Sequence, residues 1–106
     1  MVIEFNKEQG TVVAAVKGRM DAITAADFEE GMAEWIAKGE TAFLIDLQEM
    51  DYISSAGLRA ILKISKSLKP LNGAMRFRGL QDHVKEVFKI SGFDTLFQIS
   101  ESVKAL

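Results

Sequence analysis

The stretch TAFLIDLQEMDYISSAGLRAILKISKSL, residues 41–68, decides the fold of this chain. Its first seven residues are mostly apolar, which predicts a buried strand over residues 41–47. Apolar residues then recur at positions 58, 61, 62, 64 and 68, the spacing of a helix with a wide apolar face over residues 55–68. A buried strand followed by an amphipathic helix is the building unit of an α/β sheet.

Upstream of this unit the sequence predicts a β-hairpin. Residues 2–5 and 11–16 are short apolar runs, and the polar loop between them ends at Gly10. We expect Gly18 to break the second of these strands. The hairpin would supply an antiparallel edge to the sheet.

A first helix is predicted between the hairpin and the buried strand. Thr24, with Asp27 three residues later, forms a weak version of the capping box, and Gly39 is a plausible stop. The apolar residues at helical spacing between them are Phe28, Met32, Trp35 and Ile36.

Downstream, residues 74–78 alternate apolar and basic side chains, as in a strand with one polar face. A third helix is predicted over residues 81–90, with Gly92 as its stop. A short last strand over residues 96–99 follows, and residues 100–106 permit a terminal helical turn.

This order of elements predicts one domain over residues 1–106 with an α/β fold. We expect a mixed, mostly parallel sheet of about five strands, because crossover helices join parallel strands. The N-terminal hairpin adds the antiparallel pair, and the helices lie mainly on one face.

Composition excludes several classes of function. The net charge of -2, from 13 basic and 15 acidic side chains, gives no electrostatic case for wrapping nucleic acid, which usually needs a clustered basic surface. No apolar run is long enough to insert into a membrane. The absence of cysteine excludes disulfides and thiol catalysis. A cytoplasmic location is the simplest interpretation.

The sequence also lacks the residues of an enzyme or a metal site. His83 is the single histidine, and beside Asp82 in the first turn of a helix it is expected to be a surface residue. Asp46, Glu49 and Asp51 lack the pattern of a calcium loop and are interpreted as solvated charge at a strand end. We therefore expect no catalysis, no metal and no cofactor.

The informative segment is MDYISSAGLR, residues 50–59, which joins the buried strand to the apolar helix. Sites of parallel α/β folds gather at such strand ends. Ser54 and Ser55 begin the helix, where unpaired amides favour an added negative charge. One serine suffices as a cap, so the second is open to another role.

At this point the sequence resembles the anti-sigma factor antagonists, which are single STAS domains. The serine motif YISSAGLR at residues 52–59 carries the resemblance. Three other segments stand in register with it: GRMD at residues 18–21, FLIDL at residues 43–47 and VKEVFKISGF at residues 84–93. Together they cover nearly the whole chain.

The resemblance implies a bacterial partner-switching mechanism that regulates transcription. The unmodified antagonist binds an anti-sigma factor, which is also a serine kinase, and so frees a sigma factor. The kinase phosphorylates the antagonist on a serine and weakens the complex, and a serine phosphatase reverses this. Carried over, the acceptor is Ser55, with Ser54 as the second candidate because it stands where many members have aspartate.

The same resemblance, with the loop position of these residues, predicts a partner-binding surface. Its expected members are Asp21, Tyr52, Ile53, Ser54, Ser55, Gly57, Leu58 and Arg59. A phosphate adds about -1.5 to -2 charges to such a surface. An uncompensated loss of roughly 3 kcal/mol would weaken binding about a hundredfold.

Two alternatives remain open at the level of sequence. The chain could be a STAS subunit of another assembly, in lipid transport or in the regulation of secretion. It could also be a nucleotide-binding protein or an enzyme that uses Ser55 or His83, although no phosphate-binding loop accompanies Gly57.

Overall fold

The computed structural model describes residues 2–101 of the chain. In chain order its elements are β1 (Val2–Glu8), β2 (Thr11–Met20), α1 (Ala22–Ala37), β3 (Ala42–Asp46), β4 (Met50–Ile53), α2 (Ser55–Leu68), η1 (Lys69–Leu71), β5 (Ala74–Arg78), α3 (Asp82–Ser91), α4 (Phe93–Leu96) and β6 (Ile99–Ser100). The helix predicted over residues 55–68 and the strand predicted over residues 74–78 are confirmed to the residue.

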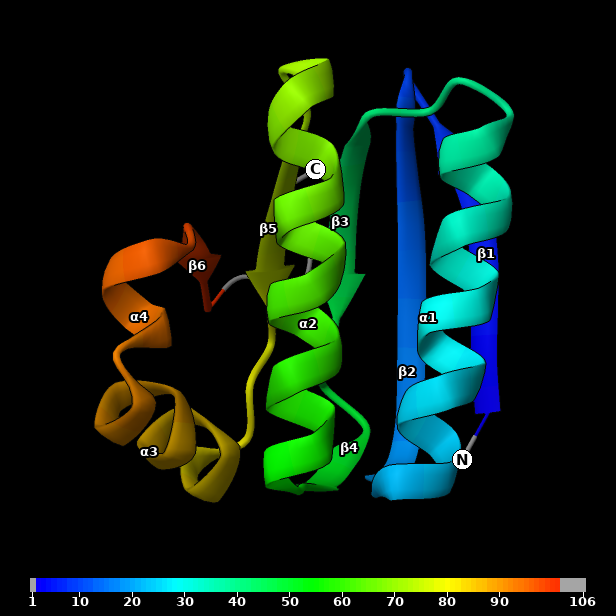
Figure 1. Ribbon diagram of the computed structural model, residues 1–106. Helices are drawn as coiled ribbons and strands as arrows, with labels where there is room; N and C mark the ends of the chain where they lie inside the picture. Colours follow the sequence, from blue (N-terminus) through cyan, green and yellow to red (C-terminus); the bar gives the residue numbers. More distant parts are fainter. Residues whose placement is uncertain (1, 102–106) are drawn as a thin grey trace.

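The strands form a single mixed sheet, with α1 and α2 side by side on one face (Figure 1). Its order is β1-β2-β3-β5-β6, and β4 pairs with β2 outside this path. Only β1 and β2 pair antiparallel among the described strands; every other pair is parallel. The expected fold class is confirmed, with six strands rather than about five.

The N-terminal hairpin is longer than predicted. Gln9 and Gly10 form its turn with φ angles of 50° and 81°, the paired positive values of a type I′ turn. Gly18 does not end β2, which continues to Met20. Instead Gly18 takes a φ of 91°, and the register shifts there as β2 passes from one neighbour, β3, to another, β4.

Strand β4 was not predicted, because its four residues show no alternation of apolar and polar side chains. Met50 and Ile53 at its ends are buried, whereas Asp51 and Tyr52 between them are exposed. Tyr52 pairs with Arg19 of β2, and Ile53 with Met20. The segment expected to be a loop is therefore fixed to the sheet directly before α2.

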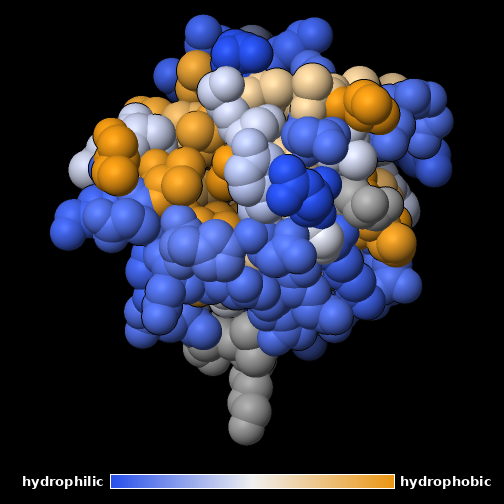
Figure 2. All heavy atoms as spheres, turned by 90° about the horizontal axis from the view of Figure 1, so that it is seen from below, coloured by the Kyte–Doolittle hydropathy of each residue, from blue (hydrophilic) through white to orange (hydrophobic). Residues whose placement is uncertain are grey.

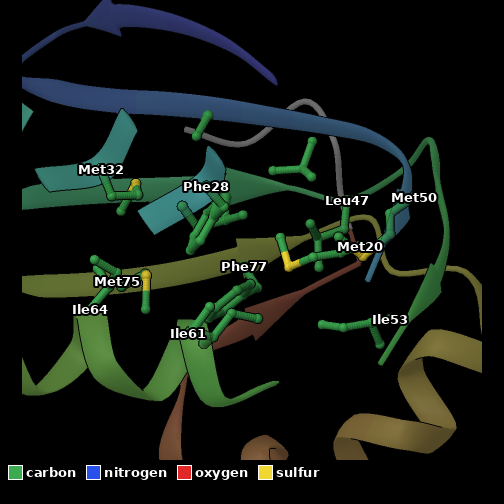
Figure 3. Close-up of a cluster of buried hydrophobic side chains, with 14 of the residues drawn as sticks. Met20, Phe28, Met32, Leu47, Met50, Ile53, Ile61, Ile64, Met75 and Phe77 are labelled. Atoms are coloured by element: carbon green, nitrogen blue, oxygen red, sulfur yellow. The ribbon is translucent and has the colours of Figure 1, made fainter. Parts of the chain in front are cut away.

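The core lies between the sheet and the two large helices. Figure 3 shows Phe28 and Met32 of α1 and Ile61 and Ile64 of α2 directed toward the strands. Side chains from the strands and loops meet them, among them Met20, Leu47, Met50, Ile53, Met75 and Phe77. Burial of each large apolar side chain contributes about 1.5–3 kcal/mol, so this layer fixes α2 firmly on the sheet.

The C-terminal region differs from the prediction in one element. Gly92 ends α3 in the left-handed conformation, with a φ of 82°, as expected. The predicted strand over residues 96–99 is instead the end of α4 followed by β6, which pairs with β5. The helical turn expected within residues 100–106 falls mostly outside the described residues.

Candidate protein-binding site

The two serines at the start of α2 have different roles. Ser54 is the N-cap: its backbone is extended, and its hydroxyl oxygen accepts a hydrogen bond from the amide of Gly57 at 3.2 Å. Ser55 is the first helical residue and is exposed. Within residues 2–101 its hydroxyl makes no hydrogen bond. Ser55 thus presents an unengaged nucleophile to solvent, at the positive end of a helix.

Gly57 fixes how closely α2 approaches the strands. A Cβ at this position would lie 2.7 Å from Cγ1 of Ile53 and 3.0 Å from Sδ of Met20. Both are core side chains, so only glycine allows the first turn of α2 to lie against β4 and the end of β2. Gly57 is buried, and its close contact with the strands sets the position of the two serines that precede it.

The segment before the serines is held on two sides. The amide of Ser54 donates to the carbonyl oxygen of Met20 at 2.9 Å, which continues the pairing of β4 with β2. The guanidinium of Arg19 lies over the ring of Tyr52, 4.1 Å from its centroid. Arg19 was not among the predicted site residues, since its position depends on a cross-strand pair with an unpredicted strand.

The start of α3 provides the second support. The side-chain amide of Gln81 donates to the carbonyl oxygen of Gln48 at 3.0 Å. A ring nitrogen of His83 lies at hydrogen-bonding distance from the carbonyl oxygen of Asp51. His83 is exposed, as predicted, and its neighbour is a main-chain carbonyl rather than a nucleophile. This arrangement supports the segment and does not resemble a catalytic pair.

Asp21 caps α1, which corrects the predicted cap at Thr24. Its carboxylate accepts hydrogen bonds from the amides of Ile23 and Thr24, each at 3.1 Å. The hydroxyl of Thr24 in turn accepts from the amide of Asp21 at 2.8 Å, which completes a capping box one turn earlier than expected. Hydrogen bonds from the amide and hydroxyl of Thr24 lower the pKa of Asp21.

The remaining predicted residues divide between surface and core. Tyr52 is 37% exposed and Arg59 is exposed, but Ile53 is only 6% exposed and belongs to the core. The Ile53 side chain therefore does not lie on the surface around Ser55, where it was expected, but packs beneath Gly57. Leu58 is half-buried and packs against the core.

Figure 1 shows that α1 and α2 begin at the same end of the molecule, where β4 also lies. Figure 2 looks onto this end: hydrophobic groups gather at separate sides, with near-neutral and hydrophilic groups between them. Ile23, in the first turn of α1, is 78% exposed and adds an apolar side chain that the sequence did not point to. Such a mixed surface suits protein docking.

The three acidic residues near this end do not form a metal site. Asp46 is 8% exposed and pairs with Arg78 at 3.2 Å, so its interpretation as solvated charge is wrong. Glu49 pairs with Lys17 at 3.6 Å, and Asp51 is exposed. Among residues 2–101 no three histidine or acidic side chains come together as metal ligands. Within the same residues no helix is long and apolar enough to cross a membrane.

Comparison with known proteins gives consistent results in sequence and in structure. The family model of the STAS domain matches residues 2–106. The protein BtrV of Bordetella bronchiseptica, whose name places it among the anti-sigma factor antagonists, is 37% identical over 99% of this chain and 90% of its own length.

Two solved structures share the fold. A Thermotoga maritima protein named as an anti-sigma factor antagonist has a TM-score of 0.89 at 19% identity, over 95% of this chain and 87% of that one. The Bacillus cell-fate determinant SpoIIAA in its phosphorylated form has a TM-score of 0.77 at 16% identity, over 97% and 94% of the two chains.

Proposed function

Because the chain belongs to the STAS domain family, and resembles its anti-sigma factor antagonists, we propose that it is a phosphorylation-controlled antagonist of an anti-sigma factor. Unmodified, it binds the anti-sigma factor and so releases a sigma factor. The anti-sigma factor is also the serine kinase that modifies the antagonist, and a serine phosphatase removes the phosphate. The switch operates in the cytoplasm, where sigma factors act, and the chain itself catalyses nothing.

The observation that carries this proposal is that the two serines make different contacts. Ser54 already uses its hydroxyl oxygen as a helix cap, whereas the Ser55 hydroxyl is exposed and free within the described residues. A kinase can approach Ser55 without breaking a hydrogen bond of the fold. Ser55 is therefore the favoured acceptor, and Ser54 the second candidate.

The local structure also supports a switch that leaves the fold unchanged. A phosphate on Ser55 would stand at the N-terminus of α2, where helix amides are unpaired and negative charge is favourable. The same phosphate in a packed interface must be desolvated or paired. Phosphorylation would then weaken the complex without destabilising the free protein.

The binding surface of this proposal surrounds Ser55. Tyr52, Arg59 and the unpredicted Ile23 provide its exposed side chains. Asp21, Ile53, Ser54 and Gly57 fix the backbone that presents them, and Leu58 lies half-buried at the margin.

The phosphorylated position can be mapped by mass spectrometry after incubation with the cognate kinase and ATP. Ser55→Ala should abolish incorporation, because the free hydroxyl is gone. The matched control is Ser54→Asn, which removes the other hydroxyl but retains a good N-cap; it should be phosphorylated like the parent. Phosphate on residue 54 in the parent would refute the assignment to Ser55, and no phosphate on either would refute the regulatory mechanism.

A further inference from the structure

The charged side chains of helix α2 are all basic, although the protein as a whole is slightly acidic. The helix contains Arg59, Lys63 and Lys66 and no acidic residue, whereas α1 beside it contains acidic residues and no basic one. The chain as a whole has a net charge of -2, so the positive helix does not follow from general basicity. These cations surround a surface hollow of about 500 Å³, lined by Arg59, Leu62, Lys63, Lys66 and Ser67.

Two of these cations have no partner within the described residues. Lys63 pairs with Glu29 of α1 at 3.2 Å. Arg59 and Lys66 are exposed and form no ion pair with any residue from 2 to 101. Unpaired cations of this kind are available to a partner at no cost to the fold.

The same cations lie in line with the switch serine. Ser55, Arg59, Leu62 and Lys66 follow one another at spacings of four, three and four residues, which places them on one stripe of the helix. Ser55 and Arg59 are therefore neighbours one turn apart. Leu62, half-buried, contributes an apolar group between the two free cations.

We propose that this stripe, Arg59, Leu62 and Lys66, is a docking surface for an acidic strip on the anti-sigma factor. Carboxylates of the partner pair with the two cations, and an apolar side chain covers Leu62. The inference rests on the proposed function and extends the interface from the loop onto the outer face of α2. A protein partner is favoured over nucleic acid or an anionic membrane because two free cations on a negatively charged protein are too few for either.

A phosphate on Ser55 would act directly on this stripe. A phosphoserine brings about -1.5 to -2 charges, close to the charge of the two free cations. It lies one helical turn from Arg59, within reach of an intrahelical ion pair. Modification of Ser55 would therefore occupy Arg59 and cancel most of the charge that the partner recognises.

The test is the affinity for the purified cognate anti-sigma factor at low and high salt, with a matched pair of charge reversals. Lys66 and Lys89 are both exposed lysines in the last turn of a helix, α2 and α3 respectively. Lys66→Glu should weaken binding by roughly threefold to tenfold at low salt, and the deficit should shrink as salt screens it. Lys89→Glu should bind like the parent.

The outcomes separate this inference from the function on which it rests. If the parent binds and responds to phosphorylation, but Lys66→Glu binds as tightly as Lys89→Glu, the stripe is not part of the interface. If Lys66→Glu instead loses affinity for anionic vesicles and not for the anti-sigma factor, the partner class is wrong. If the parent itself does not bind the anti-sigma factor, the proposed function fails as well.

Discussion

At the scale of single residues, the motif around the switch divides into residues that present the site and residues that support it. Ser55 and Arg59 are exposed, whereas Ile53 and Gly57 are buried beneath them. Sequence alone does not tell an exposed residue from a buried one here, because Tyr52 and Ile53 are adjacent and both carry large apolar groups. The distinction follows from β4, which turns Ile53 into the core and Tyr52 outward.

Gly57→Ala tests the supporting role directly. Alanine in a helix normally stabilises by about 1 kcal/mol relative to glycine. Here its Cβ would lie 2.7 Å from Ile53, and such overpacking costs about 1–3 kcal/mol. We expect a net loss of unfolding free energy in urea titrations, and weaker partner binding because α2 must shift.

Gly31→Ala in α1 is the control for this prediction. Its Cβ would lie 2.7 Å from Cζ of Phe5, the far end of a half-buried ring that can move aside. The variant should be more stable than Gly57→Ala and bind like the parent. Equal stability of the two variants would show that a Cβ at position 57 is tolerated as well as one at position 31, against the close packing argued for Gly57.

At the scale of elements, Asp21 caps α1 and Ser54 caps α2, and both helices begin at the end of the molecule that carries Ser55. The sequence predicted α2 to the residue because Ser54 and the apolar spacing agree. It misplaced the start of α1, because Thr24 is a good capping residue in isolation. The structure uses Thr24 as the reciprocal member of a box that Asp21 begins.

The cap at Asp21 predicts a pH-dependent contribution to stability. The pKa of Asp21 is lowered in the folded state, chiefly by the hydrogen bond from the amide of Thr24. A lowered folded pKa means that this contribution is present above the unfolded value of about 3.9 and is lost as pH falls through the folded value. Urea unfolding should show Asp21→Ala less stable than the parent at pH 7, with a smaller difference at acidic pH.

Asp21→Asn is the informative control, because asparagine caps a helix without a titrating group. It should retain most of the stability at neutral pH and lose the acid-dependent part of the difference. A stability difference between Asp21→Ala and parent that stays constant down to acidic pH would contradict a role for the ionised carboxylate.

At the scale of the whole molecule, the sequence predicted the class of the sheet and the N-terminal hairpin, and α1 and α2 lie on one face as expected. The sequence did not predict β4, and it placed the last strand a few residues too early. Both strands are short and are stabilised by neighbours distant in the chain. The sequence also treated Asp46 as solvated, because the pairing with Arg78 depends on β3 and β5 lying side by side. The exposed residues Arg19 and Ile23 were also missed. Arg19 reaches the site through its cross-strand pair with Tyr52, and Ile23 through the first turn of α1.

The architecture as a whole favours a rigid switch. Helix α2 is fixed to the core by Ile61, Ile64 and Leu68, while Ser55 at its start remains exposed. Modification can therefore change the surface charge without moving the helix. Control of binding would come from the interface and not from a second conformation.

The most direct test of this account is a titration of the cognate anti-sigma factor with unmodified protein and with protein phosphorylated stoichiometrically on Ser55. We expect the phosphorylated form to bind at least about a hundredfold more weakly, which corresponds to roughly 3 kcal/mol. Its circular dichroism and thermal unfolding should match those of the unmodified form. Equal dissociation constants for the two forms would contradict the central claim that a phosphate on Ser55 switches binding off.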